Sequence, residues 1–349
     1  GGQRGVGCRG GGRYARGCAG LQPLTFRGNP PLLAFQLGPR FGGVAGLRGG
    51  GKHRIYPGRT STNGTFSSGG GIYNTGLATL SASMVLSNAA QIGGGGISNA
   101  GTLTLTQTTL AANAATQAGA IENQGTLLVE QGVIRGNEAW QGGGGIHNIN
   151  GAVSVLRSVI AENRAGSDGG GIWNNGSLAL TITSLFRNEA DADEDGFGSG
   201  GGIYSDGATS RVALTDTAVI SNTAQDGGGL CSLDGILTFH TGQVSENVSG
   251  GSGGGIYNEG MLKVEGGEGD SVRFRSWLPL QSVETTPGDW GSIAFLGSSV
   301  DSACVVKHSV IDGSTKGVWG QNASPVIRSL RVGDASEYGI LLESTECTD

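Results

Sequence analysis

Apolar and polar residues alternate in short runs along the middle of this chain. Leu103-Thr-Leu105 and Leu178-Ala-Leu180 are two such runs, in which every second residue is apolar. A period of two is typical of β-strands, whereas an amphipathic helix places apolar residues every three or four positions. No strong helix-forming stretch separates the runs. The pattern therefore predicts an all-β chain.

The runs belong to a repeat that opens with a Gly-Gly-x-Ile element. The aliphatic residue of this element recurs every 24 to 31 residues, at Ile72, Ile97, Ile121, Ile146, Ile172, Ile203, Leu230 and Ile256. The alternating run that follows ends at Leu80, Leu105, Val129, Val155, Leu180, Leu214 and Phe239. An asparagine stands eight residues after each of these, at Asn88, Asn113, Asn137, Asn163, Asn188, Asn222 and Asn247. Constant offsets of this kind indicate one structural unit repeated along the chain.

Each unit of roughly 25 residues has room for three short strands: at Gly-Gly-x-Ile, at the Leu-x-Leu run, and just before the asparagine. A coil with three strands per turn, each paired with its equivalent one turn on, is a right-handed parallel β-helix. Three inward aliphatic columns would fill its core, the third being Val85, Leu110, Ile134, Ile160, Leu185, Val219 and Val244. Glycines are expected at the corners, where φ is positive. The asparagines are expected to stack as ladders along the axis.

The Gly-Gly-x-Ile element and the apolar-x-x-Asn element resemble the repeats of bacterial polymorphic outer membrane proteins and related pectate-lyase-like β-helices. Those repeats read Gly-Gly-Ala-Ile and Phe-x-x-Asn; here alanine occurs only at Ala120, and the Phe position is aliphatic, as in Val85. The similarity covers about residues 69–265. It implies a β-helix that is secreted or displayed on a bacterial surface.

The sequence patterns at the two ends of the chain differ from that of the repeat region, residues 61–265. Residues 1–60 contain ten Lys or Arg and no Asp or Glu, are rich in Gly and Pro, and lack the repeat. Three explanations of this segment remain open: a disordered basic tail, out-of-frame translation of a GC-rich gene, or a nucleic-acid-binding tail. We expect no nucleic-acid partner. Residues 266–349 are expected to continue the coil with a divergent pattern around Ile293, Val318 and Ile340, with 278–288 as an outside loop. The pattern still runs at Asp349, as in a truncated rod.

Composition excludes several other fold classes and kinds of site. Glycine makes up 70 of the 349 residues, and only 14% of the residues are charged, which excludes an ordinary α/β domain. The five cysteines form no metal-binding spacing, and no apolar run is long enough for a membrane-spanning helix. Phosphate loops are excluded because no Lys-Ser/Thr follows the glycine runs.

Beside the first strand runs an outward column of residues at the position after each motif aliphatic. It reads Tyr73, Ser98, Glu122, His147, Trp173, Tyr204, Cys231 and Tyr257. Exposed rings in a file can stack on sugar faces, so Tyr73, Trp173, Tyr204 and Tyr257 are the candidate ligand-binding residues. Ordinary strand propensity explains the same rings. Glu122 and His147 would lie one turn apart, as a surface contact or as an acid–base couple. No catalytic residue is assigned.

The longest insertion between turns carries a second candidate site. Asp191-Ala-Asp193-Glu-Asp195-Gly resembles the first half of a calcium loop, in which alternating carboxylates converge on one ion. Gly202 stands where such a loop has its bidentate glutamate. Calcium is therefore the one candidate cofactor, and a solvated acidic loop is the alternative.

These observations favour a non-catalytic stalk or adhesin that is extracellular or on the bacterial cell surface. We expect a monomeric rod whose partner is a carbohydrate or a cell-surface protein. The alternative is a polysaccharide lyase or glycoside hydrolase on the same β-helix. That enzyme would need acidic and basic side chains clustered in a groove on one sheet, whereas the expected outer faces carry mostly Ser, Thr, Ala and Asn.

Overall fold

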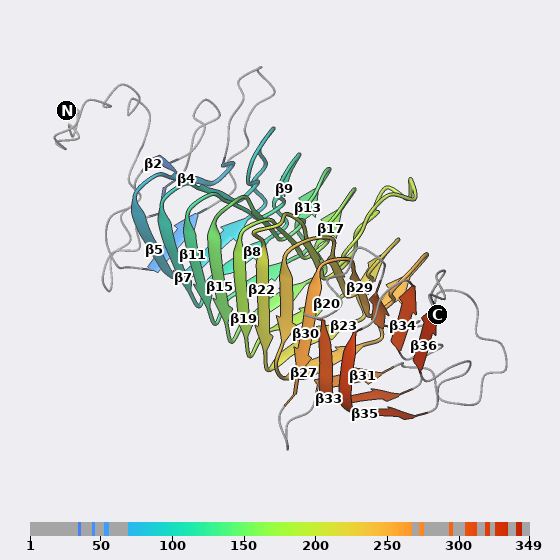
Figure 1. Cartoon of the computed structure of the whole chain (residues 1–349). Helices are drawn as coiled ribbons and strands as arrows, with labels where there is room; N and C mark the ends of the chain where they lie inside the picture. The colour runs from blue at the N-terminus through green and yellow to red at the C-terminus, as the bar shows by residue number, and fades with distance from the viewer. Residues whose placement is uncertain are drawn as a thin grey trace, which may run out of the picture.

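The computed structural model describes residues 34–35, 44–45, 52–55, 69–266, 272–275, 293–295, 304–312, 318–321, 325–333 and 340–343. Every regular element among them is a β-strand, and equivalent strands of successive turns lie side by side in parallel. Figure 1 shows the turns stacked into a rod whose N-terminal and C-terminal turns lie at opposite ends. The fold is the right-handed parallel β-helix that the sequence predicts.

The Gly-Gly-x-Ile strands form one twelve-stranded sheet, here called the motif sheet. Ile121 pairs with Ile97 on one side and with Ile146 on the other, so the repeats stack in register. The strands of this sheet are β2 (Val44–Ala45), β4 (Ile72–Asn74), β6 (Ile97–Asn99), β10 (Ile121–Asn123), β14 (Ile146–Asn148), β18 (Ile172–Asn174), β21 (Ile203–Ser205), β25 (Leu230–Ser232), β29 (Ile256–Asn258), β32 (Ile293–Phe295), β34 (Val318–Gln321) and β36 (Ile340–Glu343).

The other two strands of each turn belong to a bent nineteen-stranded sheet. Its first half holds the Leu-x-Leu strands β5 (Leu77–Leu86, which spans both halves), β7 (Thr102–Thr106), β11 (Thr126–Glu130), β15 (Ala152–Leu156), β19 (Ser177–Thr181), β22 (Arg211–Thr215), β26 (Ile236–Phe239) and β30 (Met261–Glu265). Its second half holds the strands before the asparagines, β8 (Thr109–Ala111), β12 (Val133–Arg135), β16 (Val159–Ala161), β20 (Ser184–Phe186), β23 (Thr217–Ile220), β27 (Gly242–Ser245) and β31 (Val272–Arg275). The end strands are β1 (Ala34–Phe35), β3 (Lys52–Ile55), β33 (Val305–Asp312) and β35 (Val326–Gly333).

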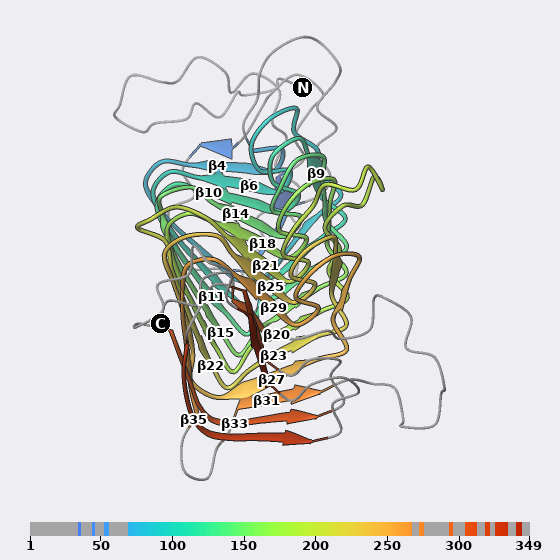
Figure 2. The same ribbon diagram turned by 45° about the vertical axis from the view of Figure 1, so that its right-hand side comes forward.

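A short strand, which the sequence did not predict, follows the asparagine in several turns. These strands are β9 (Ala114–Ala115), β13 (Glu138–Ala139), β17 (Arg164–Ala165), β24 (Thr223–Ala224) and β28 (Val248–Ser249). They pair with one another in two small parallel sheets. From them the chain loops back to the motif sheet, and Figure 2 shows these loops beside β9 along one side of the rod.

The three predicted aliphatic columns form the core. In one turn Ile121, Val129 and Ile134 have no exposed surface, and the equivalent residues of the other turns between Ile72 and Val264 are equally buried. Burying one such side chain is worth about 1.5–3 kcal/mol, so stability accumulates along the stack although each turn alone is marginal. The columns of the sequence analysis are confirmed.

The corners differ from the expectation that glycine makes them. Residues other than glycine take positive φ at two of the three corners, for example Gln107 (φ 49°) and Ala112 (φ 53°). At the Gln107 corner the buried side chain next in sequence closes the turn, because Thr108 Oγ1 donates to the carbonyl of Thr106 at 3.1 Å. Glycine is needed before the motif sheet, where Gly169 has φ 69°. At Gly145 a Cβ would lie 2.6 Å from the carbonyl oxygen of Gly171 one turn on.

The asparagine ladders are confirmed. Asn99 Nδ2 donates to Asn123 Oδ1 at 2.7 Å, and Asn113 Nδ2 donates to Asn137 Oδ1 at 2.9 Å. The first ladder consists of the asparagines two residues after the motif aliphatics, namely Asn74, Asn99, Asn123, Asn148, Asn174 and Asn258. The second consists of the seven asparagines that follow the Leu-x-Leu runs by eight residues, from Asn88 to Asn247. All asparagines of both ladders are buried. In the first ladder Ser205 and Ser232 stand in place of asparagine.

At the C-terminal end Ile293, Val318 and Ile340 pair in turn, in the strands β32, β34 and β36. The predicted loop at 278–288 lies outside the described residues. At the N-terminal end β1, β2 and β3 fall within residues 1–60, where the sequence pattern predicts no strands. Val44 pairs with Ile72 in the motif sheet. No helix long and apolar enough to cross a membrane occurs in the described ranges.

Candidate binding face

The short strands after the ladder asparagines, their equivalents in the other turns, and the loops that follow them stack on one another to form a continuous surface, here called the loop face. Trp140 N donates to Ala115 O at 3.1 Å, and Gly166 N donates to Ala139 O at 3.0 Å, so neighbouring loops keep the register of the rod. Figure 1 shows these loops projecting from one side of the stack. The loop face comprises residues 89–93, 114–118, 138–142, 164–168, 189–199, 223–227 and 248–252.

The loops cover most of the aromatic column, contrary to the expectation that its rings are exposed. Tyr204 is only 7% exposed, and of the four candidate aromatics only Tyr73, at 39%, is freely exposed. Trp173 and Tyr257 are half-buried. Over Trp173 the backbone of the preceding loop is close enough that a Cβ on Gly142 would lie 3.2 Å from its Cδ1. The rings do stack along the axis, since the Trp173 and Tyr204 centroids are 6.2 Å apart.

Glu122 and His147 are neighbours in register, but each binds other partners. The Glu122 carboxylate is buried and accepts a 2.7 Å hydrogen bond from the Ser98 hydroxyl. His147 Nδ1 lies 3.0 Å from the Gln117 carbonyl oxygen, so this nitrogen carries the proton. Burial lowers the pKa of His147, against the opposing effect of the hydrogen bond to Gln117 and of the Glu122 charge. His147 therefore holds the loop of Gln117 against the motif sheet, whereas Glu122 bonds to a neighbouring strand of that sheet.

Carboxylates surround the C-terminal half of the column. Burial raises the pKa of Asp168; the hydrogen bond from Ser199 N, at 2.9 Å, opposes this, and the charge of Asp206 adds to it. Burial, followed by the charges of Asp168 and Asp206, also raises the pKa of Tyr204. The charged groups that shift Tyr204 are acidic and include no Lys or Arg. The mixed acidic and basic groove that a lyase needs is not formed around this part of the column, within the described residues.

The loop face exposes two other aromatic side chains. Trp140 and Phe197 are each 77% exposed, more than any other large hydrophobic residue in the described ranges. Trp140 stands three residues after the ladder asparagine of its turn. Two repeats later, Asp191 occupies the equivalent position. Gly166 occupies this position in the turn between them. A Cβ there would lie 3.4 Å from Asp193 Oδ2, so only a glycine separates the turn of Trp140 from this carboxylate.

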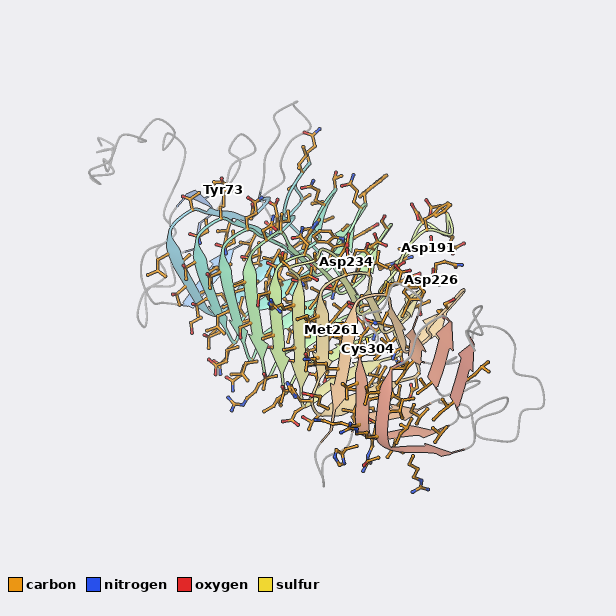
Figure 3. All side chains as sticks on the ribbon, viewed as in Figure 1. Tyr73, Asp191, Asp226, Asp234, Met261 and Cys304 are labelled. Carbon is orange, nitrogen blue, oxygen red and sulfur yellow. The ribbon has the colours of Figure 1, made fainter. Side chains whose placement is uncertain are left out.

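The three aspartates of the candidate calcium loop do come together. One carboxylate oxygen from each of Asp191, Asp193 and Asp195 lies within 4.8 Å of the others. Gly196 N donates to Asp191 Oδ1 at 3.0 Å, and Phe197 N donates to Asp195 Oδ1 at 2.9 Å. Figure 3 shows Asp191 on the projecting side of the rod, with Asp226 farther along it. This loop could hold a hard cation through oxygen ligands.

Sequence reasoning missed Trp140, Phe197 and the carboxylates that join neighbouring loops. Asp226 Oδ1 accepts a hydrogen bond from Ser252 N at 2.6 Å. Two repeats earlier, Asp168 accepts one from Ser199 N in the same way. Both aspartates stand four residues before a motif aliphatic, which is a signal the sequence contains.

No protein-family model, curated protein or solved structure matches this sequence. The assignment of the chain to the parallel β-helices therefore rests on its own stacked turns and their register.

Proposed function

We propose that this chain is a non-catalytic β-helix of the stalk or adhesin type, which works outside the cell or at the bacterial surface and presents its loop face to a partner. The stacked core makes the rod rigid, while the loops vary from turn to turn without disturbing it. Carbohydrates and cell-surface proteins are the partner classes that we expect.

The observation that carries this proposal is the exposure of Trp140 and Phe197. Removing such a ring from water when a partner binds lowers the free energy, and aromatic residues are enriched where proteins bind partners. Both rings lie on loops that the backbone hydrogen bonds of neighbouring turns hold in place. A rigid loop loses little conformational entropy when it binds.

An array of glycans and immobilised polypeptides of defined charge, probed with the labelled full chain, tests this function. We expect a signal that falls in W140A. The variant W173A separates the two surfaces, because Trp173 belongs to the half-buried column. A signal lost only in W173A would place the ligand on the column, as the sequence predicts. Cleavage of a polysaccharide, or no signal at all, would contradict the proposal.

We also propose Ca²⁺ as a ligand of Asp191, Asp193 and Asp195. Three oxygens within 4.8 Å of one another can share one ion, with water and backbone carbonyls completing the shell. The ion would offset the repulsion between these carboxylates.

Isothermal calorimetry and thermal melting with added Ca²⁺ test this site. We expect binding heat and a rise in Tm that both disappear in D193N/D195N, since binding to the folded state alone stabilises it. The control D216N changes an exposed carboxylate on a different side of the turn. If the unaltered chain shows no binding heat and no shift in Tm on addition of Ca²⁺, the proposed site is wrong.

A further inference from the structure

We propose that the partner of the loop face is a polypeptide segment rich in Lys and Arg, which the face binds through carboxylates and exposed aromatic rings together. This inference rests on the proposed function and specifies the chemistry of the partner.

The first argument is the charge of the loop face. It contains eight carboxylates and one basic side chain, a difference of seven negative charges; the carboxylates are Glu138, Asp168, Glu189, Asp191, Asp193, Glu194, Asp195 and Asp226. The single basic residue, Arg164, is already paired, because its Nε lies 2.9 Å from Glu189 Oε2 and its guanidinium donates to the Ala192 carbonyl at 3.2 Å. The face therefore offers many acceptors for cations and no free cation of its own among its residues.

The second argument is the position of the aromatic rings relative to these carboxylates. Phe197 follows Asp195 by two residues, and its backbone N–H is bonded to that carboxylate. Trp140 is separated from Asp193 by the glycine turn at Gly166. A Lys or Arg side chain can place its charged group on a carboxylate and its apolar stem, or its cation, against a ring.

The same features disfavour the other partners. An acidic polysaccharide would be repelled by the seven excess charges. A neutral glycan could bond to the carboxylates and to the Gln and Ser side chains of the face, but it carries no charge to offset the seven excess negative charges, as a basic segment does. A purely apolar partner would leave Asp193, Glu194 and Asp195, all exposed, facing its surface without compensation.

The test measures binding of a fluorescein-labelled octalysine peptide to the full chain by anisotropy, in EDTA, at low and at physiological salt. Octaglutamate and a neutral β-linked glucose oligosaccharide serve as comparison probes. The variants are W140A and the loop triple D193N/E194Q/D195N, in which Asn at position 195 keeps the acceptor for Phe197 N. The matched control is the triple E162Q/D216N/D234N, which removes as many exposed charges outside the loop face.

We expect octalysine to bind in a salt-sensitive manner, about tenfold more weakly to the loop triple and about threefold more weakly to W140A. The control triple should change affinity less than twofold. Added Ca²⁺ should compete with the peptide.

Equal weakening by both triples, or unchanged binding in W140A, would overturn the inference, because net charge alone would then explain the binding. Glycan binding that depends on Trp140, without peptide binding, would also overturn it and leave the proposed function standing. If neither the array nor the peptide gives a signal, both the inference and the proposed function fail.

Discussion

Removing one amide from the second asparagine ladder should destabilise the rod far more than removing an exposed amide. Asn137 has no exposed surface. Its Oδ1 accepts hydrogen bonds from Asn113 N at 3.0 Å and from Asn113 Nδ2 at 2.9 Å. Its Nδ2 donates to Leu110 O at 3.2 Å and to Asn163 Oδ1 at 2.9 Å. The substitution Asn137→Ala deletes all of these interactions.

The cost follows from the groups that lose a partner. Asn113 Nδ2 still bonds to Val85 O at 3.0 Å, but the buried Asn113 N–H loses its acceptor. A buried donor without a partner costs about 1–3 kcal/mol, and each ordinary hydrogen bond lost adds about 0.5–1.5 kcal/mol. The unpartnered Asn113 N–H and the three other lost hydrogen bonds should together make Asn137→Ala cost roughly 2.5–7.5 kcal/mol. The exposed Gln141→Ala, in the adjoining loop, should cost less than about 0.5 kcal/mol.

Urea denaturation followed by circular dichroism measures the global effect, and hydrogen exchange of the Asn113 amide measures the local one. The exchange experiment matters because a solenoid can unfold turn by turn, so that a single transition does not describe it. We expect faster exchange at Asn113 in Asn137→Ala only. Equal stability of the two variants, with unchanged exchange at Asn113, would refute the ladder as a source of stability.

Three further predictions concern the core and the buried charges. Leu105→Ala should cost about 2–5 kcal/mol by leaving a cavity, whereas Thr104→Ala on the outer face of the same strand should cost little in urea titrations. Because burial raises the pKa of Asp168 above 3.8, the charge of this carboxylate destabilises the fold at neutral pH. Asp168→Asn should therefore raise Tm at pH 7, and the gain in Tm should vanish well below pH 3.8. An unchanged Tm at pH 7 would contradict this account of Asp168. The pKa of His147 is lowered below 6.5, so the unfolded chain binds the proton more readily and stability should fall as the pH drops below 6.5; His147→Gln should reduce that fall, and an identical pH profile would contradict the assignment.

The fold could be predicted because the repeat specifies it at several levels at once. The spacing of Ile97, Ile121 and Ile146 set the length of a turn, and the period of two identified the strands and their inner faces. The corners could not be predicted in the same way. Gln107 takes positive φ before Thr108, and Gln131 takes the same conformation (φ 51°) before Gly132, so no single residue type marks this corner in the sequence.

The candidate site was predicted only in part. The spacing of Asp191, Asp193 and Asp195 correctly indicated that these carboxylates converge. Alternation in the motif strand correctly placed Tyr204 on the outer side of the sheet, but it could not show that a loop covers this side chain. Burial by a loop depends on the path of the chain between strands, which strand periodicity does not describe. Trp140 was missed for the same reason, because it lies in such a loop.

Disulfide trapping between adjacent turns tests the central claim, that successive repeats stack in register. Thr104 and Leu128 are register partners on the outer faces of β7 and β11, at a separation that suits a disulfide. The double variant T104C/L128C should cross-link on mild oxidation, as peptide mapping by mass spectrometry would show, and T104C/E130C, shifted by two residues, should not. Cross-linking of the shifted pair in preference to the register pair would contradict the stack.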